Sequence, residues 1–158
     1  MEGRVAEIYG ILEMTLALRG ELMTWLKDDD LAFRVTMNPT LGQLCREIGE
    51  VQLAYTESLK TLKLDLSYRA ENGAELEASV EKLTAWYTDL NAAMKSAIET
   101  LSEDDLGNKL VDRTFFELSL GAQIHTFREA LLIFYAKVDV YLRAMDKEPS
   151  DNWQGWIG

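Results

Sequence analysis

The sequence has few residues that would break a helix, cross-link the chain or carry common catalytic chemistry. Its 158 residues include two prolines, one cysteine and one histidine. Because Cys45 has no second cysteine to pair with, an internal disulfide is excluded, which fits a reducing compartment. A chain of this length can bury a substantial core without disulfides or metal. We therefore expect one domain over residues 1–158.

Positive charge and long apolar runs are also scarce. The chain has 16 Lys and Arg residues against 27 Asp and Glu residues, a net charge of -11. Nucleic-acid binding depends on Lys and Arg side chains that neutralise phosphates, so we expect no nucleic-acid partner. Charged residues interrupt the first 25 positions, which argues against a signal peptide or a membrane span. We expect a cytoplasmic protein that makes no membrane contact.

Several well-known catalytic motifs are missing. The chain has no glycine-rich phosphate loop, no Gly-x-Ser-x-Gly segment and no Cys-x-x-Cys pair. No active site can therefore be assigned from a motif.

The chain does contain long stretches whose apolar residues recur every three or four positions, a pattern typical of helices. The expected helices cover about residues 4–26, 40–64, 74–101 and 114–146, with a Trp-containing tail over 147–158. Capping-box spacing at Thr40 and Gln43, and again at Thr114 and Glu117, marks the second and fourth starts. We expect an all-α four-helix bundle with longer connections before the second and fourth helices.

The fourth stretch has the clearest heptad pattern. Its apolar seam consists of Leu120, Ile124, Phe127, Leu131, Phe134, Val138, Tyr141 and Met145. Aromatic residues outside the seams include Trp25, Trp86, Tyr135, Trp153 and Trp156. We expect Trp153 and Trp156 to fold the tail back over the bundle. Trp86 and Tyr135 fit either the edge of the core or an interface.

The only histidine offers one candidate metal site. His125 and Glu129 are one helical turn apart, so they could hold a divalent metal such as Zn or Ni together with Glu47. Both lie one position away from the apolar seam, which favours a solvated or hydrogen-bonded histidine instead.

The single cysteine offers a second candidate. Arg46 follows Cys45 and could lower the pKa of its thiol. However, Cys45 lies beside the apolar stripe of its helix and has no inward histidine to act as a base. A buried, inert thiol is the favoured interpretation.

Five segments occur in a fixed order along the chain. They are "ELMTWL", "NPTLGQLCREIGEVQLAY", "LTAWYTDLNAAMKSAIETLSEDDL", "VYLRAM" and the tail "EPSDNWQGWIG". In this order the sequence resembles the DinB/YfiT-like superfamily of four-helix bundles, and the resemblance covers nearly the whole chain. The name DinB refers to a damage-inducible bacterial group, so the resemblance also suggests a bacterial, stress-associated protein.

The resemblance implies where a metal would be held. Many members bind a divalent metal with one histidine from the second helix and two from the fourth, spaced His-x-x-x-His. The matching positions here are Glu47, Ala130 and Phe134. Methyl and phenyl groups cannot coordinate a cation. The resemblance therefore implies a member without a metal cofactor, in which Phe134 fills the space of an imidazole.

Three interpretations of function remain. We favour a metal-free protein that acts by binding, either a small molecule in a pocket lined by Thr126, Phe127 and Tyr141 or a partner protein, with a homodimer expected. A second is an enzyme similar to the family's thiol-dependent S-transferases, or a hydrolase, with a rearranged metal site. Its ligands would be Glu47, His125 and Glu129. A third is a structural or stress-associated protein whose core is filled around Phe127 and Phe134.

Overall fold

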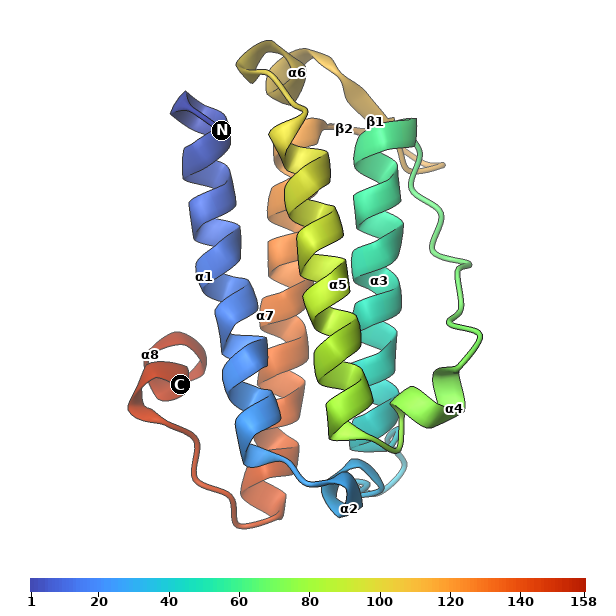
Figure 1. Ribbon diagram of the computed structural model, residues 1–158, viewed down its shortest axis with the longest axis vertical. Coiled ribbons are helices and arrows are strands. Elements are labelled where there is room, and N and C mark those ends of the chain that lie inside the picture. Colours follow the sequence, from blue (N-terminus) through green and yellow to red (C-terminus); the bar gives the residue numbers. More distant parts are fainter.

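The computed structural model describes residues 1–158 and is mainly helical (Figure 1). The elements are α1 (Gly3–Trp25), α2 (Asp28–Leu31), α3 (Leu41–Thr61), α4 (Gly73–Leu76), α5 (Val80–Glu99), α6 (Glu103–Asn108), β1 (Leu110–Asp112), β2 (Glu117–Ser119), α7 (Leu120–Ala144) and α8 (Asp151–Ile157). Because the two short strands form the only sheet, the expected all-α class is confirmed.

Four long helices, α1, α3, α5 and α7, lie side by side and define the shape of the molecule (Figure 1). Helices α1 and α3 each contact both α5 and α7. Their facing side chains belong to one cluster of 35 buried hydrophobic residues. The heptad seam of the fourth stretch lies inside this cluster except for Met145, which is partly buried and packs against it. Phe127 and Leu131 are fully buried. None of the helices combines the length and apolar character of a membrane-crossing segment.

The start of α3 is as the sequence predicts. The Thr40 hydroxyl accepts a hydrogen bond from the Gln43 backbone N–H at 3.1 Å, and the Gln43 side chain accepts one from the Thr40 N–H at 2.9 Å. These two bonds satisfy backbone donors that the first helical turn leaves free. The helix ends at Thr61 because Leu62 adopts a left-handed conformation, so it is shorter than expected.

The predicted start of the fourth helix is wrong. Residues 110–119 form an antiparallel hairpin in which Val111 pairs with Leu118, and α7 begins only at Leu120. Ser119 caps it, since its hydroxyl accepts from the Ala122 N–H at 3.3 Å. Thr114 lies in the hairpin turn with φ at 75°, so it does not cap a helix.

Two other boundaries also differ. The third expected helix is split into α4 and α5, because the helical conformation is interrupted before Ser79. The Ser79 hydroxyl caps α5 by accepting a hydrogen bond from the Lys82 N–H. The acidic run at 28–30 forms the short helix α2 rather than a loop. Its carboxylates lie in the first turn, where the helix dipole favours negative charge.

The tail folds back as helix α8, which lies beside α1 in Figure 1. Trp153 is fully buried, with its ring centroid 5.5 Å from that of Trp25 and 5.2 Å from that of Tyr135. Trp156 remains 40% exposed, so only the first of the two indoles enters the core. Tyr135 is also a core residue, since it is fully buried. Its hydroxyl donates a hydrogen bond to the Thr15 carbonyl at 2.8 Å. Trp86 is half-buried and stacks on Tyr87.

Candidate functional site

The three positions singled out by the family resemblance lie in one pocket. Glu47 on α3 and Ala130 and Phe134 on α7 all line a cavity of about 220 Å³ between these two helices, here called the α3–α7 pocket. Its other lining residues are Leu44, Ile48, Val51, Ile133 and Lys137. Ala130 and Phe134 face the same way because they are one helical turn apart.

The chemistry of this pocket is apolar with charge at its edge. Phe134 and Ile48 are buried, and they supply the hydrophobic surface. Glu47 and Lys137 are exposed and carry opposite charges. The Glu47 carboxylate lies 3.9 Å from the guanidinium of Arg46, which is already paired with two other carboxylates at 2.6 Å, so Arg46 balances little of the Glu47 charge. Such a site suits a small molecule with an apolar body and one polar end.

The residues of the α3–α7 pocket do not fit a divalent metal. Only Glu47 carries a donor atom at the three matched positions, whereas Zn or Ni is held by three or more N, O or S ligands. The molecule contains no group of three or more His, Cys, Asp or Glu side chains that could hold a metal ion.

The alternative set of Glu47, His125 and Glu129 is not assembled by the fold. His125 and Glu129 are both exposed on α7, and neither lines the α3–α7 pocket beside Glu47. Five residues along an α-helix correspond to about 7.5 Å and about 140° of rotation. His125 is therefore turned well away from Ala130, which faces the pocket.

The three residues expected to line a pocket have structural roles instead. Phe127 is fully buried against Tyr55, with ring centroids 5.4 Å apart. The Tyr141 hydroxyl donates to the Pro39 carbonyl at 2.6 Å, and the Thr126 hydroxyl donates to the Ala122 carbonyl at 2.9 Å. None of the three is part of the α3–α7 lining, because the apolar seam turns Phe127 and Tyr141 into the core.

Cys45 is fully buried, as the sequence predicts. Burial raises the pKa of its thiol to about 12, and this outweighs the opposing effects of Tyr87 and Arg19. A thiol that stays protonated is a weak nucleophile. The cysteine therefore belongs to the core and not to a reactive site.

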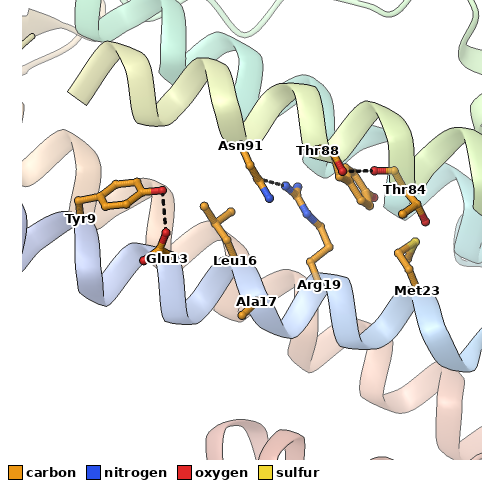
Figure 2. A pocket seen from close by; sticks show the side chains of 11 residues that line it. Tyr9, Glu13, Leu16, Ala17, Arg19, Met23, Thr84, Thr88 and Asn91 are labelled. Carbon is orange, nitrogen blue, oxygen red and sulfur yellow. Dashed lines mark hydrogen bonds between the residues drawn. The ribbon is translucent and has the colours of Figure 1, made fainter. Parts of the chain in front are cut away.

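A second pocket of about 260 Å³ lies between α1 and α5 and contains an unusual core residue (Figure 2). Its lining residues, which define the α1–α5 pocket, are Tyr9, Glu13, Leu16, Ala17, Arg19, Gly20, Met23, Thr84, Tyr87, Thr88 and Asn91. The side chain of Arg19 extends from α1 toward Asn91 on α5 and is almost completely buried.

Arg19 is held by neutral groups only. Its Nη2 donates to the side-chain oxygens of Gln52 and, at 2.8 Å, Asn91. The ring centroid of Tyr87 lies 3.8 Å from the guanidinium carbon, a cation–π contact. The Nε and Nη1 atoms of Arg19 have no hydrogen-bond partner.

Sequence reasoning missed Arg19, although a signal was present. Leu12, Leu16 and Met23 follow the apolar stripe of the first helix, and position 19 falls on the same stripe at a heptad step from Leu12. A basic residue at such a position must be buried or must distort the packing, so the sequence pattern indicates a buried Arg19.

The sequence matches no protein-family model and no curated protein. Function is therefore inferred from the two pockets and from the residues that line them.

Proposed function

We propose that this protein is a metal-free, DinB-like four-helix bundle that binds a small organic molecule in the α3–α7 pocket. The observation that carries the proposal is the meeting of Glu47, Ala130 and Phe134 in one cavity. Two apolar side chains at these positions favour binding over metal-dependent catalysis.

The lining residues indicate the kind of ligand. A cavity of about 220 Å³ is smaller than the range of about 300–1,000 Å³ that is usual for drug-sized ligands. The ligand we expect is small, with an apolar body against Phe134 and Ile48. A polar group at its outer end would reach Glu47 or Lys137.

A pocket-filling substitution tests this site. Ala130→Trp should abolish saturable binding of the neutral fluorescent probe N-phenyl-1-naphthylamine, because the indole would occupy the cavity. Ala92→Trp is the matched control, since Ala92 is exposed on α5, outside the lining and away from the outer face of α7. Circular dichroism checks that both variants fold. Equal probe binding by the wild type and both variants would contradict the proposal.

Elemental analysis separates this proposal from a metal-dependent enzyme. We expect no more than about 0.1 metal ion per chain after incubation with Zn, Ni or Mn followed by buffer exchange, because Glu47 alone supplies only one ligand. A metal close to one per chain that disappears in Glu47→Ala would reject the metal-free interpretation.

We also propose that a second copy of the chain covers the outer face of α7. Ile133 and Val140 are 58% and 56% exposed, and they lie a heptad apart on one side of the helix. Ile133 also lines the α3–α7 pocket, so a dimer formed there would cover the pocket edge. Light scattering coupled to gel filtration should give a dimer mass for the wild type and a monomer mass for Ile133→Glu/Val140→Glu. A monomeric wild type would refute this part of the proposal.

A further inference from the structure

We propose that the α1–α5 pocket binds a small organic monocarboxylate through Arg19, at a site separate from the α3–α7 pocket. The inference does not depend on the function proposed above, because the two cavities share no lining residue.

The charge of Arg19 has no counter-charge in the protein. None of the salt bridges includes Arg19, and its two hydrogen-bond partners are the neutral amides of Gln52 and Asn91. Burial lowers its pKa, yet a guanidinium keeps its proton under all ordinary conditions. A buried, unpaired cation is costly, and an anionic ligand would offset that cost.

The guanidinium is already held in place for a ligand. Gln52 and Asn91 both accept from Nη2, and the Gln52 amide also donates to Asn91 at 3.0 Å, which links the three side chains. The Tyr87 ring covers one face. This fixed arrangement leaves Nε and Nη1 as charged donors without a partner, the type of group that binds carboxylate oxygens most strongly. Both atoms are buried, so a carboxylate in the pocket reaches them only after the groups that cover them move aside. Arg19 itself would lose little side-chain freedom on binding.

The rest of the pocket limits the ligand to one negative charge and a small apolar body. Leu16 and Met23 supply apolar surface on either side of Arg19 (Figure 2). Glu13 also lines the pocket, and its carboxylate accepts a hydrogen bond from the Tyr9 hydroxyl. This carboxylate would repel a second negative charge on the ligand. Arg19 is the only cationic residue in the lining, so a phosphate dianion would remain poorly compensated.

The test compares acids with their uncharged amides. Benzoate and hexanoate are titrated into the wild-type protein at constant ionic strength, with benzamide and hexanamide as matched probes. Binding is followed by calorimetry and by the NMR signal of the Arg19 Nε–H, which is assigned from its loss in Arg19→Met. At least one acid should bind saturably, at least tenfold more tightly than its amide, and should shift the Arg19 signal.

Two variants locate the binding. Ala17 is exposed at the pocket lining, so Ala17→Trp should block the pocket without disturbing the core and should abolish binding. Ala92→Trp, on an exposed position of α5 outside the lining, should bind like the wild type. Arg19→Met should also lose binding, while Arg34→Met, at an exposed position, should not. If Arg19→Met fails to fold, the Arg19 Nε–H signal is assigned by through-bond correlation to the Arg19 backbone, and that signal and Ala17→Trp decide.

The proposal is overturned if no acid binds, if acids and amides bind equally, or if Ala17→Trp binds like the wild type. It is also overturned if chloride or phosphate produces the same affinity and the same Arg19 shift as the carboxylates, since the site would then hold an inorganic anion only. Loss of probe binding in Ala130→Trp has no bearing on these outcomes, so the two proposals can fail separately.

Discussion

Arg19, Cys45 and Tyr87 are buried neighbours contributed by α1, α3 and α5. The Tyr87 ring stacks on Arg19, and its hydroxyl donates to the Cys45 carbonyl. Burial is the main reason that the pKa of Cys45 rises to about 12 and that of Tyr87 rises well above its ordinary value. Burial therefore keeps the Cys45 thiol and the Tyr87 hydroxyl in their protonated, uncharged forms.

Cys45 should be unreactive in the folded protein. Because its thiol is buried and burial raises its pKa to about 12, iodoacetamide should modify it at least roughly a hundredfold more slowly in buffer at pH 8 than in guanidinium chloride. Mass spectrometry of samples taken over time measures both rates. Complete labelling of the native protein within minutes would contradict a buried thiol.

At the scale of elements, local patterns predicted the four long helices but not the connections. The capping box at Thr40 succeeded because both of its partners lie within one turn. The same spacing at Thr114 and Glu117 failed, because a non-local pairing competes there. The Asp112 N–H donates to the Leu62 carbonyl and its carbonyl accepts from the Leu64 N–H, both at 2.9 Å. Such contacts across about fifty residues have no local sequence pattern.

The candidate sites also depend on contacts between residues that are far apart in the sequence. Glu47, Ala130 and Phe134 line one pocket, but they were selected through the resemblance, because composition and periodicity alone would not have selected an alanine. Arg19 was visible only as a break in an apolar stripe. Its role becomes apparent from partners on α3 and α5, which periodicity within α1 cannot identify.

The start of α7 can be tested by substituting its cap. Ser119→Ala should lower the free energy of unfolding by about 1 kcal/mol, because the Ala122 N–H loses its acceptor. Thr114→Gly should not destabilise the protein, since a β-branched residue at φ 75° is strained and glycine is not. Chemical denaturation measures both. A loss of stability in Thr114→Gly with none in Ser119→Ala would reject the observed boundary.

Helix α8 depends on one tryptophan. Trp153 is fully buried and its indole N–H donates to Asp139 at 3.0 Å. Trp153→Ala should therefore lower the free energy of unfolding by about 3–5 kcal/mol. Trp156→Ala is the matched control: this side chain is partly exposed, and we expect its loss to cost less than about 1 kcal/mol. Equal effects of the two substitutions would show that α8 does not pack as described.

For the whole molecule, the buried acids make stability sensitive to high pH. Cys45 and Tyr135 both have a pKa raised by burial, so the folded state keeps protons that the unfolded chain releases. Their contribution to stability is complete below the ordinary thiol pKa of 9.0 and is lost progressively as the pH rises toward about 12.

We expect the free energy of unfolding to fall steadily between pH 9 and pH 11, a window set by the Cys45 thiol. Guanidinium denaturation at constant ionic strength measures this dependence. Cys45→Ala should show a shallower slope above pH 9, because one of the coupled protons is removed. A wild-type stability that stays constant up to pH 11 would contradict the assigned protonation states.

The position of Trp153 in the sequence has a consequence for synthesis. The ribosome makes the four long helices before it makes α8, yet Trp25 and Tyr135 pack against an indole that belongs to α8. Until translation passes that tryptophan, the nascent chain leaves one flank of its aromatic core without its final partner. Completion of the core thus waits until α8 has been made, whatever order the earlier helices follow.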